Sequence, residues 1–448
     1  MPPVVATMPR TPLIGNLWDL QADRLGFLQE VYRTCGDVGI FYLGLKKIFV
    51  FTSPQYAQRI LVEDAKSFEK GPILRKFSQP FIGDGLLTCR NSDHLKKRRF
   101  LAPSFHRKTL AHFVAPIQKI TREAVQWDPG RKVNLYPQMM KLTMRVIGQV
   151  LLSMDIEQQA PLLSKAIHVG MKDVSERIRT PLYPPLWLPT KANRNTKKHL
   201  AAIDRFFLQI IADRRGKLAQ QGAEGEPSVD VLSLLIQARD DQACQLTDKE
   251  IRDELATLIF AGFETTTNAI AWTMCFLSRH PEVRDRARLE VQQVLGDSPC
   301  SAVHLEDLNY VQAVIEESMR IYPPAHTVGR VAAVNMDVCG VPVGKGDIAL
   351  VCPYLMHRRP DIFPQPEVFQ PQRFYDQQLR SVIPKYTYMP FGLGPRSCIG
   401  GQLAMIELKI ILATLLQAHH RWRLCEDFPV PYTTISIRPR GDVPCLFG

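Results

Sequence analysis

The sequence has no run of the roughly 18 consecutive apolar residues that a span across a bilayer requires. Its first ten residues contain three prolines and no long apolar core, so we expect neither a signal peptide nor a membrane anchor. The 448 residues are 45% hydrophobic and 22% charged, which is ordinary for a globular protein with a large core.

The ten cysteines show no CxxC pair and no finger-like spacing, which argues against a structural zinc site. Scattered cysteines in apolar surroundings are typical of reduced thiols, so we expect a cytoplasmic protein. The formal net charge of +12 is compatible with nucleic acid, an anionic membrane surface or an acidic protein partner. Because the sequence shows no helix-turn-helix, zinc-finger or RNA-binding signature, we expect no nucleic acid partner.

Hydrophobic periodicity predicts a β-rich beginning followed by helices. Two β-rich runs, 38–42 and 47–51, predict a hairpin, and a short helix is expected to start near Pro54. Amphipathic stretches lie near 107–126, 138–154, 193–217, 230–239, 248–279, 282–295 and 309–321. In the longest helix, which should measure about 45 Å and be central, Thr247 and Glu250 are expected to form a capping box.

A cysteine stands in a glycine-lined loop that leads into an apolar helix, Phe391-Gly392-Leu393-Gly394-Pro395-Arg396-Ser397-Cys398-Ile399-Gly400. Unpaired N–H groups and the positive end of the helix dipole would stabilise a Cys398 thiolate. Gly392, Gly394 and Gly400 permit φ > 0 and the close approach of a flat ligand, and Arg396 offers a cation for a carboxylate.

Phe391, Gly394, Arg396, Cys398 and Gly400 fit the signature FxxGxRxCxG, so the chain resembles the cytochromes P450. Average residue usage gives a chance match on the order of 10⁻⁷ per position. The resemblance implies that the loop binds haem b (iron protoporphyrin IX), with Cys398 as the proximal iron ligand. It covers nearly the whole chain and implies one domain, 1–448. The implied fold is a mainly helical prism around a long central helix, with a β-rich part at about 1–70 and a helical haem-binding part at about 71–448.

Two further segments match the family in the same order. Glu317-Ser318-Met319-Arg320 resembles its ExxR motif, and Pro371-Gln372-Arg373-Phe374 resembles PERF with Gln in the second place. Glu317 and Arg320 share a helix face, so an ion pair extended by Arg373 is geometrically reasonable. Spacing alone would favour an ordinary surface salt bridge. The resemblance instead implies a structural role in holding the cysteine loop.

In the long helix, Ala261-Gly262-Phe263-Glu264-Thr265-Thr266 resembles the oxygen-binding motif (A/G)Gx(D/E)T. Ala261 and Gly262 are then expected beside the haem, where Gly262 leaves room for a diatomic ligand. Thr265 can bond to the i−4 carbonyl and distort the helix. The acid–alcohol pair can relay protons, with Glu264 as their source and Thr265 as donor to the distal oxygen. Such a sequence alone is more often helical core.

The resemblance assigns the haem propionates to Arg330, Arg396, His94 and Arg98. Arg330 follows Arg320 by ten positions, as in the family. His94 replaces the Trp of the family's WxxxR, and i,i+4 spacing places it on the same helix face as Arg98. Imidazole can donate a hydrogen bond as indole does, but it also titrates.

Family correspondence places the wall of the substrate pocket at mostly apolar residues, namely Leu74, Phe77, Phe81, Leu86, Thr257, Phe260, Ala325, His326 and Thr327. This wall favours a lipophilic substrate such as a terpenoid or fatty acid. Two interpretations of His326 stay open, an anchor for a polar group and a histidine satisfied by backbone. The apolar, proline-rich loop 181–189 is either a lid or a segment packed on a neighbouring helix.

The implied activity is that of a haem-thiolate monooxygenase, RH + O₂ + 2e⁻ + 2H⁺ → ROH + H₂O. Without a flavin- or ferredoxin-like extension, a monomeric enzyme would take electrons from a ferredoxin- or flavodoxin-type partner and its reductase. The basic residues Lys96, Lys97, Arg98, Arg99, Arg107 and Lys108 would dock that partner or form a solvated face.

Two other functions keep the haem. One is a peroxide-dependent peroxygenase or isomerase, against which Glu264 and Thr265 argue. The other is a non-catalytic haem sensor or carrier.

Overall fold

The chain is organised as two compact units, each built from segments that are distant in sequence. The computed structural model describes residues 5–180, 183–221, 230–239, 245–433 and 435–448. A β-rich unit comprises Met1–Pro72, Gln312–Cys398 and Val430–Arg440, and a helical unit comprises Ile73–Val311, Ile399–Pro429 and Gly441–Gly448. The β-rich part therefore extends well beyond the predicted 1–70, because strands from both halves of the chain share one sheet.

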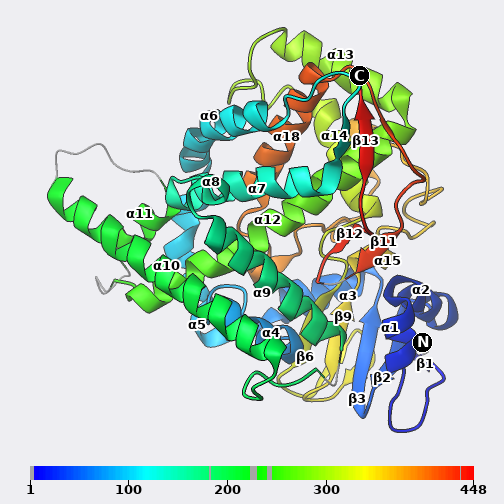
Figure 1. Ribbon diagram of the computed structural model, residues 1–448. Helices are drawn as coiled ribbons and strands as arrows, with labels where there is room; N and C mark the ends of the chain where they lie inside the picture. Colours follow the sequence, from blue (N-terminus) through cyan, green and yellow to red (C-terminus); the bar gives the residue numbers. More distant parts are fainter. Residues whose placement is uncertain (1–4, 181–182, 222–229, 240–244, 434) are drawn as a thin grey trace. The chain divides into compact units, whose positions relative to one another are not determined.

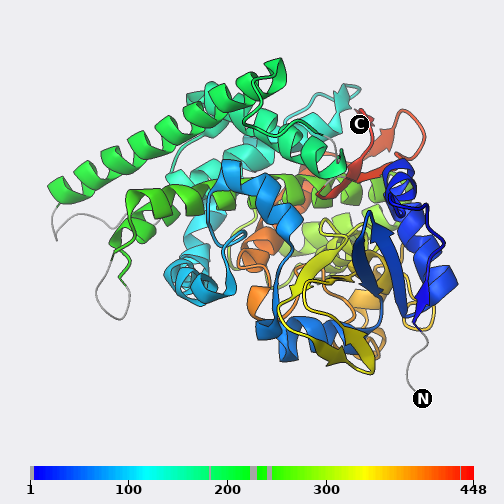
Figure 2. The ribbon, with the colours of Figure 1, turned by 90° about the horizontal axis from the view of Figure 1, so that it is seen from below.

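The main sheet of the β-rich unit has the strand order β1-β2-β3-β9-β6-β4. Its strands are β1 (Ala6–Thr7), β2 (Val38–Leu43), β3 (Lys46–Phe51), β4 (Phe68–Lys70), β6 (Val328–Ala332) and β9 (Ile348–Val351). The predicted hairpin is confirmed, because β2 and β3 pair antiparallel, whereas β3 and β9 pair in parallel. Figure 2 shows the blue N-terminal strands beside the yellow strands from the C-terminal half.

Shorter elements complete the β-rich unit. They are α1 (Leu17–Ala22), α2 (Arg24–Cys35), α3 (Pro54–Gln58), α15 (Pro353–Met356), α16 (Gln372–Tyr375), α17 (Gln377–Ser381), most of α14 (Asn309–Ile321), and the hairpins β7 (Met336–Val338) with β8 (Val341–Val343) and β11 (Pro431–Thr433) with β12 (Ile437–Pro439). One apolar cluster joins the sheet to α3 and the turn after it, including Phe49, Phe51, Tyr56 and Leu61. This packing fixes the backbone of Leu61, which matters for the cysteine loop.

The helical unit is a bundle of eleven described helices and a small sheet. The helices are α4 (Pro72–Ile82), α5 (Asn91–Leu101), α6 (Arg107–Ala124), α7 (Leu135–Leu152), α8 (Ile156–Gln159), α9 (Pro161–Arg179), α10 (Lys191–Gln221), α11 (Val231–Gln237), α12 (Asp248–Arg279), α13 (Pro281–Leu295) and α18 (Gly401–Ala418). The sheet has the order β10 (Trp422–Leu424), β13 (Pro444–Phe447), β5 (Lys132–Asn134). The predicted helices from 107 onward are present, whereas α9 was not predicted.

Helix α12 is the central element of this bundle, as its length predicted. Thr247 and Glu250 form the expected capping box, with Glu250 N donating to Thr247 Oγ1 at 3.2 Å and Thr247 N to Glu250 Oε2 at 2.9 Å. In Figure 1 it runs through the middle of the helices and contacts α7, α10, α11, α13 and α18. Tyr136 Oη donates to Asn268 Oδ1 at 2.9 Å, which fixes α7 against it.

Among the described helices, only α18 is long and apolar enough to cross a membrane, with a mean hydropathy of 1.4. Polar residues separate the apolar residues of α18, so its sequence contains no continuous apolar run of membrane-spanning length. Since 61% of this helix is buried, it has the character of a core helix.

Candidate active site

A buried ion pair lies on α14 of the β-rich unit. Arg320 donates to Glu317 through Nε at 2.7 Å and Nη2 at 2.9 Å, and both side chains are fully buried. Arg373 Nε lies 3.4 Å from Glu317 Oε1, so the three-residue cluster has the predicted geometry. The surface salt bridge that spacing alone favoured is therefore wrong. Two charges removed from water are stable only when hydrogen bonds satisfy them fully.

Further hydrogen bonds connect this ion pair with the segment that precedes the cysteine loop. Arg320 Nη1 donates to the carbonyl of His357 at 2.9 Å, and the His357 ring accepts at Nε2 from Met389 N at 3.0 Å. Burial, with the nearby Arg320, lowers the pKa of His357 to about 3, so its ring is a neutral acceptor. Sequence reasoning missed His357, because a lone histidine outside a motif gives no signal.

The cysteine loop follows directly, between Met389 and α18. Gly392 N donates to the carbonyl of Met389 at 3.0 Å, and Cys398 N donates to that of Phe391 at 2.8 Å. Cys398 is exposed and stands three positions before the first residue of α18, where N–H groups and the helix dipole favour an anionic sulfur. None of the described cysteines forms a disulfide.

The glycines of this loop have different roles. Gly392 and Gly394 have positive φ, 70° and 67°, as expected. Gly400 has φ −88° and is the N-cap of α18, so the positive φ that glycine permits is not adopted there. A Cβ on Gly394 would lie 1.9 Å from the carbonyl oxygen of Leu61, whereas a Cβ on Gly392 would lie 3.9 Å from its nearest neighbour, Ser397 Cα.

These two glycines allow steric overlap to be separated from backbone strain. Gly392→Ala should cost only the strain of positive φ, about 1–2 kcal/mol, whereas Gly394→Ala must also displace the backbone of Leu61. We expect Gly394→Ala to lower the midpoint of chemical unfolding clearly more than Gly392→Ala, as followed by circular dichroism. Equal midpoints would show that the loop does not press against Leu61.

Two arginines of the β-rich unit, Arg330 and Arg396, lie close enough to interact. Arg330 is 5% exposed, and its Nη1 donates to the carbonyl of Gly329 at 3.0 Å. Burial and the positive charge of Arg396 lower the pKa of Arg330 to about 10. Two buried or half-buried cations that repel each other form a site whose charge an anionic group such as a carboxylate would balance.

The motif Ala261–Thr266 lies in the middle of α12, in the helical unit. Thr265 Oγ1 donates to the carbonyl of Ala261 at 2.7 Å, the i−4 bond expected from the sequence. The helix nevertheless continues without a break from Asp248 to Arg279, so the expected distortion does not interrupt it. The side chains of Glu264 and Thr265 are half-buried, and Ala261 is exposed.

The surroundings of Gly262 do not support the expectation that this glycine leaves room for a diatomic ligand. A Cβ at Gly262 would point at Ile147 of α7 and lie 2.8 Å from its Cδ1. Glycine therefore allows α12 to pack closely on α7, and the residue does not clear a space on the exposed side of the helix. Ala261, one position earlier, is the small residue that faces open space.

The predicted propionate residues His94 and Arg98 lie one turn apart on α5, in the helical unit. His94 is buried and Arg98 is half-buried. The basic run around them is only partly a surface patch. Lys97 Nζ forms an ion pair with Glu254 Oε1 at 3.2 Å, and its side chain is only 12% exposed, so Lys97 cannot dock a partner as expected. Arg107 pairs with Glu306, while Lys96, Arg99 and Lys108 are exposed.

The predicted pocket residues of the helical unit are mostly packed. Phe81 is 1% exposed, and its ring lies 6.3 Å from that of Phe260, where Gly170 of α9 closes over both. Thr257 Oγ1 donates to the carbonyl of Ile82 at 3.3 Å. Leu86 is buried and Phe77 half-buried, whereas the side chain of Leu74 lies outside the described residues. Phe81 and Thr257 are thus packed against neighbouring elements of the helical unit.

The remaining pocket residues, Ala325, His326 and Thr327, alternate in exposure. Ala325 is exposed and Thr327 half-buried, whereas His326 is 3% exposed. The segment lies just before β6, and of the three side chains only that of His326 is buried. Its Nδ1 has no hydrogen-bond partner among the described residues. Burial lowers the pKa of His326 to about 3, so its ring is neutral, and both interpretations of its role stay open.

The apolar loop 181–189 is tied to its neighbouring helices, as far as it is described; residues 181 and 182 lie outside the described part. Arg177 Nη1 donates to the carbonyl of Pro184 at 2.8 Å, and Asn193 Nδ2 donates to the carbonyls of Pro185 at 2.7 Å and Leu188 at 2.8 Å. Trp187 remains 76% exposed. The described part of the loop is therefore anchored to α9 and α10.

An exposed cysteine before a helix N-terminus, a buried ion pair and two neighbouring arginines are thus the main features of the candidate site in this mainly helical protein. The family model described as "Cytochrome P450" matches residues 6–441, and the chain belongs to this family. The predicted fold class, mainly helical with a small β-rich part, is thereby confirmed.

Curated relatives cover almost the whole chain. Cyclooctat-9-en-7-ol 5-monooxygenase of Streptomyces melanosporofaciens is 32% identical over 430 residues, which cover 95% of this chain and 89% of the relative. Pentalenene oxygenase of Streptomyces avermitilis is 27% identical, with 98% and 93% covered. Human cytochrome P450 4V2 is 29% identical, with 94% and 84% covered. Family and relatives identify this protein as a cytochrome P450 monooxygenase.

Proposed function

We propose that this monooxygenase uses haem b to insert one oxygen atom of O₂ into a terpenoid substrate. The exposed Cys398 supports iron ligation, and the mutually repelling Arg330 and Arg396 fit the two propionates of haem b. His94 and Arg98 would contribute further propionate contacts, with Phe391, Gly392, Gly394 and Gly400 lining the same cofactor. When bound, haem supplies the oxidation chemistry, which a thiolate ligand directs toward O–O cleavage.

The protein's own contribution is to hold and move protons. Thr265 donates its hydroxyl to the Ala261 carbonyl at 2.7 Å, so its oxygen is fixed in place and can still accept a hydrogen bond from another donor. Glu264, the neighbouring half-buried carboxyl, is the source of the proton that replaces the one Thr265 donates. This acid–alcohol pair favours O₂ as oxidant over peroxide and argues against a peroxygenase, an isomerase or a sensor.

The terpenoid assignment is supported by two relatives named for terpenoid oxidation, cyclooctat-9-en-7-ol 5-monooxygenase and pentalenene oxygenase. Exposed Ala325 and half-buried Thr327 offer small, weakly polar contacts of the kind that a hydrocarbon skeleton accepts. We further propose a cytoplasmic monomer that takes electrons from an acidic ferredoxin or flavodoxin and its reductase. Lys96, Arg99 and Lys108 would dock that partner.

The experiment is turnover of haem-loaded protein with NADPH and a surrogate ferredoxin system on a panel of cyclic terpenes and fatty acids. We expect hydroxylated terpene that depends on NADPH and O₂. Product formed with peroxide alone would favour the peroxygenase, and ligand binding without product would favour the sensor. Fatty acid hydroxylation without terpene product would reject the terpenoid assignment alone.

The role of Thr265 can be tested in the same assay. Thr265→Ala removes the hydroxyl, so NADPH should still be consumed while product per NADPH falls at least roughly tenfold and peroxide accumulates. Thr266→Ala is the matched control, because Thr266 makes the same kind of i−4 bond, to Gly262 at 2.9 Å, and is 4% exposed. Equal coupling in both variants would contradict the relay.

A further inference from the structure

Two adjacent carboxylates in the second turn of α12 are buried. Asp253 is 4% exposed and Glu254 is 1% exposed. Carboxylates are almost never buried without partners, because the loss of hydration must be offset by hydrogen bonds or cations. Neighbouring positions on a helix point about 100° apart, so each carboxylate meets a different part of the surrounding chain.

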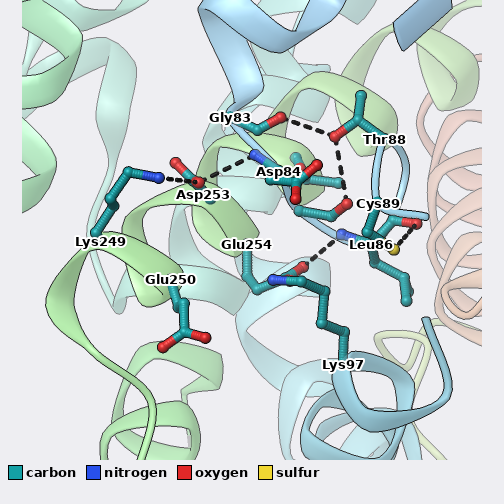
Figure 3. A network of polar contacts seen from close by, with 12 residues as sticks. Gly83, Asp84, Leu86, Thr88, Cys89, Lys97, Lys249, Glu250, Asp253 and Glu254 are labelled. Atoms are coloured by element: carbon teal, nitrogen blue, oxygen red, sulfur yellow. Dashed lines mark hydrogen bonds and ion pairs between the residues drawn. The ribbon is translucent and has the colours of Figure 1, made fainter. Parts of the chain in front are cut away.

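Both carboxylates accept hydrogen bonds from the loop between α4 and α5. Asp84 N donates to Asp253 Oδ2 at 3.0 Å, and Leu86 N donates to Glu254 Oε2 at 2.9 Å (Figure 3). Two backbone donors spaced two residues apart thus bind two side chains of one helix. Residues 83–88 are held to α12 by their main chain, so the attachment does not depend on the side chains that the loop presents.

The second oxygen of Glu254 extends the connection to a third element. Lys97 of α5 lies with its Nζ 3.2 Å from Glu254 Oε1, and the two side chains are 12% and 2% exposed. Burial raises the pKa of Glu254, although Lys97 and the Leu86 N–H act in the opposite direction. A buried pair of this kind contributes little net stability compared with apolar residues, so its value lies in the fixed placement of the groups it joins.

Two glycines of the loop, Gly83 and Gly85, allow its backbone to lie close to α12. A Cβ on Gly83, where φ is +61°, would lie 2.0 Å from Asp253 Cγ. A Cβ on Gly85 would lie 2.1 Å from Thr257 Oγ1 and 2.7 Å from the carbonyl oxygen of Asp253. The loop backbone therefore lies directly on the helix, with no room for side chains in between.

The same helix carries the proposed proton relay. Glu254 precedes Ala261 by seven positions, which is about two turns and places both on nearly the same side of α12. The anchored loop carries Leu86, a predicted pocket residue, and α5 carries His94 and Arg98. One carboxylate on the helix of the proposed relay thus binds both the loop and the helix of the proposed propionate contacts.

From this arrangement we propose that Glu254, assisted by Asp253, is a positioning residue that fixes the loop 83–88 as a wall of the substrate site. The inference rests on the proposed function, in that it concerns the lipophilic substrate of that same site. Loss of the anchor should weaken substrate binding and broaden the shapes that bind, while the rate of the chemical step changes little.

The test compares three variants of haem-loaded protein. Glu254→Met/Lys97→Met removes the anchor and leaves no unpaired buried charge, so it should fold. Lys97→Met releases α5 but leaves the carboxyl that accepts from Leu86 N. Lys249→Met is the matched control, because Lys249 contacts Asp253 at 3.4 Å from the same helix but its side chain is 82% exposed.

Two readouts are independent of turnover. Backbone amide exchange of the peptide containing Asp84 and Leu86 should accelerate at least tenfold in the double variant, less in Lys97→Met, which keeps the acceptor of Leu86 N, and stay near wild type in Lys249→Met. Binding of farnesol and of a rigid cyclic terpene, followed by the Soret shift, should weaken about tenfold, more for the rigid probe, with the carbon monoxide spectrum unchanged.

Wild-type exchange and affinity in the double variant would overturn the proposal, as would equal weakening in Lys249→Met. If the double variant does not load haem, amide exchange in Lys97→Met against a Glu254→Met variant decides the matter, since only the latter removes the acceptor of Leu86 N. Amide exchange tests the anchor even if no terpene binds or reacts, so failure of the proposed function remains distinguishable.

Discussion

Cys398→Ala should abolish the long-wavelength Soret band that the dithionite-reduced protein gives with carbon monoxide. The reason is that this band requires a thiolate on the iron, and Cys398 is the cysteine held at the start of α18. Product formation should be lost together with the band. The measurement is the carbon monoxide difference spectrum of each purified variant, normalised to haem content.

Cys425→Ala is the control for this experiment, because Cys425 is also exposed but lies outside the loop. It should keep both the band and the activity. A long-wavelength band that persists in Cys398→Ala would mean that another thiol binds iron, and the proposed mechanism would have to be abandoned.

Arg320→Lys should destabilise the β-rich unit severely. Lysine cannot donate two parallel hydrogen bonds to Glu317, and it also leaves the carbonyl of His357 without its donor. Breaking a fully buried pair in this way costs about 3–5 kcal/mol, which is a large part of the stability of a typical protein. Urea unfolding followed by circular dichroism, together with the haem-to-protein ratio, measures the effect.

Arg380→Lys, a substitution in α17 of the same unit, provides the comparison. Arg380 pairs with Glu316, the neighbour of Glu317, but its side chain is 48% exposed. Solvent screens this pair, so the substitution should cost less than about 1 kcal/mol and leave haem content unchanged. Similar costs for the two substitutions would contradict a special role for the buried pair.

Sequence reasoning succeeded where a local pattern determines the structure. Helix α12 has the predicted bounds because a capping box starts it and an apolar periodicity runs unbroken behind it. The hairpin β2–β3 was predictable for a similar reason, since its pairing is decided within 14 residues. The cysteine loop and the Glu317–Arg320 pair were found through short motifs, whose residues act on neighbours in the chain.

Prediction from the sequence failed where a contact with a distant part of the chain decides the role of a residue. Gly262 was interpreted as room for a ligand, yet its direction is set by Ile147 of α7. Lys97 looked like one basic residue of a surface run, but a carboxylate 157 positions away binds it. Glu254 itself gave no signal, because a glutamate in an amphipathic helix is normally a surface residue.

The parallel pairing of β3 with β9 also determines when the protein can fold during its synthesis. Ile48 pairs with Ile348, so 300 positions must leave the ribosome before the β2–β3 hairpin obtains its neighbour. Until then the N–H and C=O groups along that edge of β3 have no strand to pair with, and an unpaired strand edge favours aggregation. The cysteine loop is translated later still, so cofactor loading can begin only when translation is almost complete.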